Sequence, residues 1–131
     1  MYIYEKISTL EATYRERQAV ISVTMFHGGE TQNVISETCQ MAGTVRTFSE
    51  NQTETIRAAL VDVCRKAEEN SGARVEIAFR TSMNSVYNQS DMAERMRRVI
   101  DRELGTDALE TKPWVFMGGE DFAEISDRVP S

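Results

Sequence analysis

Three short runs of polar residues and glycine carry the side chains of this sequence that are best suited to chemistry. They are His27–Ile35, Gly43–Thr47 and Met117–Phe122. The first two runs are typical of a loop between two strands, and they offer the amide of Asn33 and the guanidinium of Arg46. An amide donates hydrogen bonds without titrating, and a guanidinium binds a carboxylate with two N–H groups at once. The third run is typical of a glycine turn that leads into a helix.

The histidine and cysteine content argues against a metal site within the chain. The sequence has one histidine, His27, and two cysteines, Cys39 and Cys64. A catalytic zinc site usually takes three protein ligands and includes at least one histidine, and a two-metal site needs more. We therefore assign no metal ligand and no catalytic residue. His27 precedes two glycines, so it is either a polar residue beside a turn or a ligand or proton carrier.

Composition limits the class of protein. The chain has 131 residues, enough for one domain with a core, and a net charge of −6, which argues against a nucleic-acid partner. No apolar run approaches the ~20 residues that a membrane span requires, so we expect no membrane contact. The start of the chain lacks a secretory signal pattern. The two cysteines are too few and too far apart for a disulfide framework, and we expect reduced thiols in a cytoplasmic protein.

Hydrophobic periodicity predicts a helix and two strands in the first part of the chain. The predicted helix is Tyr2–Leu10, with an extension to Tyr14 left open, and the predicted strands are Ala19–His27 and Cys39–Phe48, separated by a glycine-rich loop. No capping residue precedes the helix, which indicates a truncated chain.

The second part alternates helices with further strands. Ser49 and Gln52 have the spacing of a capping box, and an apolar stripe from Ile56 to Ala67 predicts a helix that ends at Gly72. The remaining predicted elements are a strand over Arg74–Thr81, a helix over Asp91–Leu104 capped by Ser90 or Asn88, a short strand over Pro113–Met117, and a helix over Glu120–Asp127. This order predicts an α+β fold with an antiparallel or mixed sheet and helices on one face.

The three runs, in this order and spacing, resemble the zinc-dependent aminoacylase and carboxypeptidase family of two-domain hydrolases. The resemblance implies a ferredoxin-like lid or dimerisation domain over residues 1–85, truncated so that its first strand is absent. It implies that residues 86–131 are a partial C-terminal segment of the catalytic domain. One departure is Ser36, where the family usually has proline. The family's metal ligands and general base have no counterpart in this chain.

The resemblance also implies roles for four residues. Asn33 and Arg46 would donate hydrogen bonds to substrate in the neighbouring subunit, and Gly118 and Gly119 would let the backbone approach that substrate closely. Without the resemblance, Asn33 would merely close a loop and Arg46 would form a surface ion pair. The intact enzyme would use two divalent ions, zinc or manganese, to hydrolyse N-acyl amino acids or small peptides.

Two hypotheses about the chain as a whole follow. The first is a fragment of such an amidohydrolase that forms a homodimer through the edge of the lid sheet, holds no metal and is inactive alone. The alternative is a free-standing α+β module for interaction or small-ligand binding without catalysis. Under the first hypothesis, the strand missing from the lid would leave backbone groups unpaired. We expect the segment Pro113–Met117 to pair with the lid strands in its place.

Overall fold

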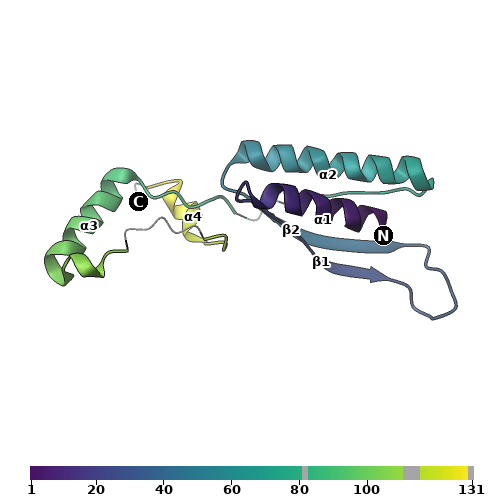
Figure 1. The fold of residues 1–131 in the computed structure, drawn as a ribbon, viewed down its shortest axis with the longest axis horizontal. Coiled ribbons are helices and arrows are strands. Elements are labelled where there is room, and N and C mark those ends of the chain that lie inside the picture. The colour runs from purple at the N-terminus through teal and green to yellow at the C-terminus, as the bar shows by residue number, and fades with distance from the viewer. Residues whose placement is uncertain (81–82, 111–115, 130–131) are drawn as a thin grey trace. The chain divides into compact units, whose positions relative to one another are not determined.

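The computed structural model describes residues 1–80, 83–110 and 116–129. The chain forms two units, Met1–Phe79 (unit 1) and Arg80–Ser131 (unit 2). Unit 1 contains helices α1 (Tyr2–Arg15) and α2 (Glu50–Ser71) and strands β1 (Val20–Gly28) and β2 (Cys39–Arg46), as Figure 1 shows. Unit 2 contains helix α3 (Ser90–Leu104), the 3₁₀ turn η1 (Thr106–Ala108) and the short helix α4 (Phe122–Ser126).

The two strands of unit 1 form an antiparallel hairpin. Val20 lies opposite Arg46 at one end of the ladder, and Gly28 lies opposite Cys39 at the other. The register shifts between Val23 and Met25, as it does at a β-bulge. Both strands predicted before residue 50 are thereby confirmed within one or two residues of their bounds.

Helices α1 and α2 lie on the same side of the hairpin (Figure 1). The core between helices and sheet consists of apolar side chains from both helices, the first strand and the residue before that strand: Tyr14, Ala19, Ile21, Ile56 and Leu60. Val63 and Ala67 continue the buried stripe along α2, as the helical spacing predicted. Near the hairpin's loop end apolar side chains stay exposed, with Met25 at 51% and Phe26 at 55%.

Both ends of α2 are closed by the residues that the sequence indicated. The Ser49 hydroxyl accepts a hydrogen bond from the backbone N–H of Gln52 at 3.3 Å. Gly72 ends the helix with φ +70°, in the left-handed region that a side chain with a Cβ resists. The cap and the terminator fix where α2 begins and ends, and with them the position of its apolar stripe over the sheet.

The strand predicted over Arg74–Thr81 is wrong for the residues that the structure describes. Residues 73–80 form no ladder, and the sheet that the described residues build has two strands, β1 and β2. This segment contacts α2 instead: the carboxylate of Glu68 accepts from the N–H of Val75 at 2.8 Å, and Arg57 lies over the ring of Phe79 at 5.0 Å. Alternating Val75, Ile77 and Phe79 supply the side-chain pattern of a strand, but a strand also needs a neighbouring backbone to pair with.

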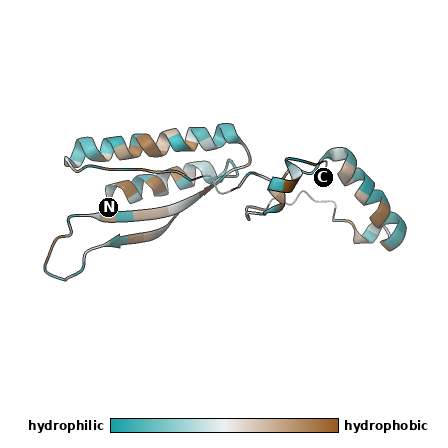
Figure 2. Cartoon of the chain, turned by 180° about the vertical axis from the view of Figure 1, so that it is seen from behind, coloured by the Kyte–Doolittle hydropathy of each residue, from teal (hydrophilic) through white to brown (hydrophobic). Residues whose placement is uncertain are grey.

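In unit 2, α3 confirms the helix predicted over Asp91–Leu104, and Gly105 follows it with φ +84°. The capping residue is Gln89, without a side-chain hydrogen bond, so the predicted caps Ser90 and Asn88 are wrong. Figure 2 shows hydrophilic and hydrophobic residues interspersed along α3. The helix predicted over Glu120–Asp127 is present as the shorter α4.

Most of the predicted strand Pro113–Met117 lies outside the described residues, so its pairing remains a prediction. The described helices and hairpin confirm the α+β class with an antiparallel sheet and helices on one face. Among the described helices, none is long and apolar enough to cross a membrane.

Candidate functional site

Asn33 lies in the loop that joins β1 to β2. This loop spans residues 29–38 and extends beyond the strand ends in Figure 1. Asn33 is exposed, and the neighbouring Val34 and Ile35 are exposed at 63% and 95%. His27, at the same end of the hairpin, is also exposed and lies opposite Gln40. The loop therefore presents an amide and two apolar side chains away from the body of unit 1, where another molecule can reach them.

Arg46 lies at the opposite end of the hairpin. It is the last residue of β2 and is paired with Val20. Its side chain or backbone also takes part in an interaction with another residue. The strand from Cys39 to Arg46 covers about 23 Å at ~3.3 Å per residue. The structure therefore does not bring Arg46 and Asn33 together within one chain, although the spacing in the sequence predicts a single loop that presents both.

Gly43 sets the close approach of the two strands. A Cβ placed there would lie 2.1 Å from the backbone oxygen of Ser22, far inside contact distance. Its neighbour across the ladder is Val23, at the register shift. Glycine at this position thus holds the hairpin geometry on which the placement of both Asn33 and Arg46 depends.

Gly118 and Gly119 belong to the turn before α4 in unit 2. A Cβ at Gly118 would lie 2.1 Å from the ring of Phe116, and one at Gly119 would lie 2.5 Å from the sulfur of Met83. The lack of side chains here is explained by packing within unit 2. Because Phe116 and Met83 occupy the space beside these glycines, close approach by a substrate at this position stays a prediction.

The residues that the structure describes do not fit a two-metal centre. Nowhere in the described ranges do three or more His, Cys, Asp or Glu side chains gather as a potential metal site. His27 stands on the hairpin, and its neighbour in the ladder is the amide residue Gln40.

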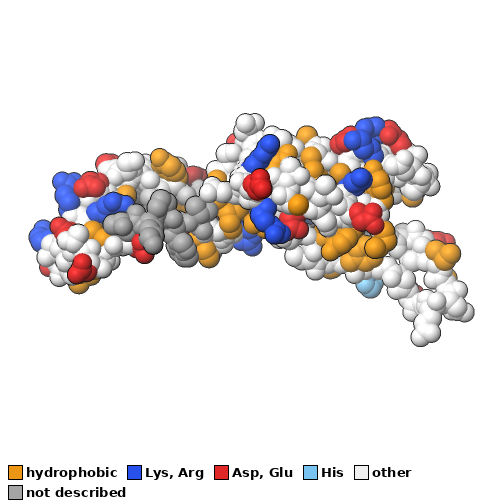
Figure 3. Space-filling view, in the orientation of Figure 1, with side chains coloured by type: hydrophobic (Ala, Val, Ile, Leu, Met, Phe, Trp, Pro, Cys, Tyr) orange, Lys and Arg blue, Asp and Glu red, His pale blue; other side chains and the backbone are white. Residues whose placement is uncertain are grey.

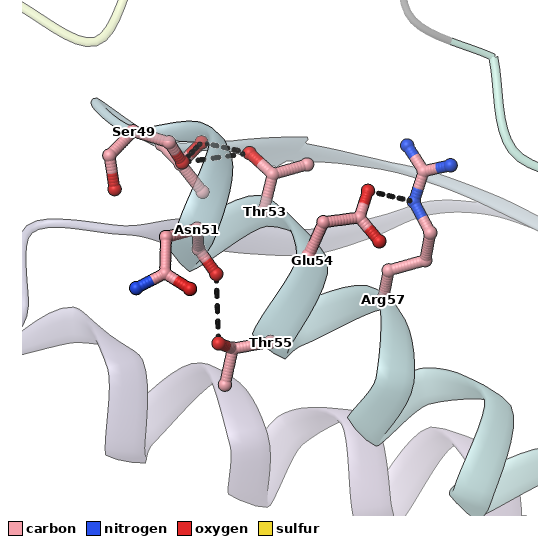
Figure 4. Close-up of polar contacts among 7 residues, drawn as sticks. Ser49, Asn51, Thr53, Glu54, Thr55 and Arg57 are labelled. Atoms are coloured by element: carbon pink, nitrogen blue, oxygen red, sulfur yellow. Dashed lines mark hydrogen bonds and ion pairs between the residues drawn. The ribbon is translucent and has the colours of Figure 1, made fainter.

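A polar hollow that the sequence pattern did not single out lies at the start of α2. Its volume is about 300 Å³, and its lining residues are Tyr14, Arg17, Ser49, Asn51, Gln52 and Thr55. Figure 4 shows two hydrogen bonds at the start of this helix, from the Thr53 hydroxyl to the backbone oxygen of Ser49 and from the Thr55 hydroxyl to the backbone oxygen of Asn51. The capping spacing of Ser49 was the one sequence signal at this position. None of the four predicted substrate-binding residues lines the hollow.

Charged side chains on the exposed face of α2 pair along the helix. Asp62 accepts from Lys66 at 2.6 Å and from Arg65 at 2.7 Å, and Arg65 also binds Glu69. The hydrogen bond from Lys66 has the largest effect on Asp62 and, together with that from Arg65, lowers the pKa of its carboxyl. The same bonds raise the pKa values of Lys66 and Arg65. Burial, followed by the negative charge of Glu68, raises the pKa of the Cys64 thiol. The pKa shifts on this helix arise from surface pairing and from the core, away from the predicted site residues.

The structure of this chain resembles part of a known metal-dependent hydrolase. The structure superposes on a dinuclear metal-binding peptidase of the M20 family from Bacillus subtilis with a TM-score of 0.74 and 26% identity, covering 95% of this chain and 34% of that one. The chain is homologous to part of the proteins in the aminoacylase and carboxypeptidase family of metal-dependent hydrolases. A comparison with descriptions of protein families gives no match.

Two proteins related to this chain in sequence are a named deacetylase and a probable hydrolase. The chain is 33% identical over 113 residues to N-acetyldiaminopimelate deacetylase of Bacillus subtilis, a match that covers 86% of this chain and 29% of the relative. It is 27% identical over 114 residues to a probable hydrolase of Synechocystis, covering 87% of this chain and 29% of the relative. The matched region thus spans less than a third of the length of these relatives.

Proposed function

We propose that this chain contributes the lid and part of the catalytic domain of a metal-dependent amidohydrolase that acts on N-acyl amino acids or small peptides. The observation that carries the proposal is the 33% identity, over 113 residues, to a deacetylase of an acylated amino acid. Residues 1–85 would form the lid and dimerisation domain, and residues 86–131 a segment of the catalytic domain. The chain by itself would be inactive.

The metal ions in this proposal belong to the intact enzyme. The structural relative is dinuclear, and we propose two divalent ions, zinc or manganese, for the complete protein. Such ions polarise the carbonyl of the scissile amide and activate water. This chain would bind and orient substrate. The metal ligands would lie in regions of the intact enzyme that have no counterpart in this chain.

We propose Asn33, Arg46, Gly118 and Gly119 as the substrate-binding residues. Asn33 projects on an exposed loop, which suits an amide donor that reaches into a neighbouring subunit. Because the hairpin holds Arg46 about 23 Å from that loop, an Asn33 and an Arg46 that contact one small substrate together would come from different copies of the chain. This differs from the expectation that one copy offers both side chains to its neighbour. A dimer is therefore part of the proposed site.

The proposed dimer forms through the outer edge of β1. Among the described strands, β1 pairs only with β2, so the backbone on its other side is open to a second chain. The exposed side chains Met25 and Phe26 are apolar and would be covered by such a contact. On the face drawn in Figure 3, hydrophobic side chains gather around α1 and the neighbouring hairpin. We also propose a cytoplasmic location, which suits the two free cysteines.

Sedimentation of the purified chain tests the dimer. At about 100 µM, well above the ~µM range of specific pairs, we expect a homodimer. Val23→Pro or Met25→Pro removes a backbone donor from the edge strand and is expected to give a monomer. Ser36→Pro, in the exposed loop, is the matched control and should leave the dimer intact.

Because proline can also unfold a strand, Phe26→Glu provides a second variant that places a charge on the edge without changing the backbone. Circular dichroism establishes that each variant keeps its helices. A wild-type chain that sediments as a monomer at this concentration, or a dimer that survives all three edge variants, would contradict the proposal.

A further inference from the structure

We draw no further inference here: the strongest candidate, the open backbone edge of β2 together with residues 73–79 that lie against α2 in unit 1, carries nothing because nothing in the structure shows what covers it.

Discussion

Gly43 determines how closely β1 and β2 approach, through the side chain that it lacks. Gly43→Ala places a methyl group 2.1 Å from the Ser22 oxygen, and this oxygen belongs to the backbone and cannot rotate away. We expect the free energy of unfolding to fall by about 1–3 kcal/mol, the usual cost of overpacking. Urea denaturation followed by circular dichroism measures the change.

Gly28→Ala is the matched control for this prediction because it lies in the same hairpin. A Cβ at Gly28 meets Cys39 at 3.5 Å, an ordinary contact. The control should change stability by no more than about 0.5 kcal/mol. If the two alanine variants lose equal stability, the close approach at Gly43 does not determine the hairpin.

The two cysteines should react at different rates. Cys39 is exposed at the start of β2, whereas Cys64 is partly buried on α2 and its pKa is raised by that burial. Since iodoacetamide reacts with the thiolate, Cys39 should be alkylated first at neutral pH, as mass spectrometry of the digested protein would reveal. In strong urea the two rates should converge. Faster labelling of Cys64 in the folded chain would show that the α2 stripe is not packed as described.

At the scale of elements, α2 couples stability to pH through Asp62. The pKa of this carboxyl is lowered in the folded chain, chiefly by the hydrogen bond from Lys66 and then by that from Arg65. The folded state thus binds fewer protons, so the stabilisation is present above the ordinary aspartate pKa of about 3.9 and disappears as the pH falls through the lower folded value. The melting temperature should therefore fall upon acidification, and Asp62→Asn should make that fall less steep.

Glu16→Gln is a suitable control for the acid titration. Glu16 is exposed at the C-terminal end of α1 and forms no ion pair with the residues that the structure describes. Circular dichroism at 222 nm, recorded during thermal melts across the acid range, gives the slopes. If Asp62→Asn leaves the slope of melting temperature against pH unchanged, or if the control changes it equally, the ion pairs on α2 contribute nothing to folding stability. Many exposed ion pairs likewise contribute nothing measurable.

Local signals predicted the elements well because each element carries its own information. The stripe from Ile56 to Ala67, the Ser49 cap and Gly72 fixed α2 without knowledge of anything else in the chain. The strand expected over residues 74–81 failed because pairing depends on a second backbone, which no alternating pattern can supply. The spacing of Asn33 and Arg46 likewise suggested a single loop that presents both residues, but Arg46 lies at the end of the hairpin far from that loop. The register of the ladder, with Arg46 opposite Val20, shows this separation.

At the scale of the whole molecule, the sequence match covers part of the length of a deacetylase. The chain aligns with 29% of its deacetylase relative, and the described residues bring together no set of three metal-binding side chains. Binding and orientation of a substrate contribute to catalysis, but hydrolysis of an amide by this family also needs the metal ions and a base. Under the proposed function, the region that would bind substrate and the region that would hold the metal ions must be joined before turnover can occur.

The purified 131-residue chain should consequently hydrolyse no N-acyl amino acid, with or without added zinc or manganese. N-acetyldiaminopimelate deacetylase of Bacillus subtilis, assayed in parallel, would serve as the positive control. Calorimetric titration with zinc should likewise show only weak binding, because a tight site requires three or four protein ligands at fixed positions. Metal-dependent turnover that co-purifies with the chain through two different columns, or a tight stoichiometric zinc site, would contradict this prediction, because the described residues bring together no set of three metal-binding side chains.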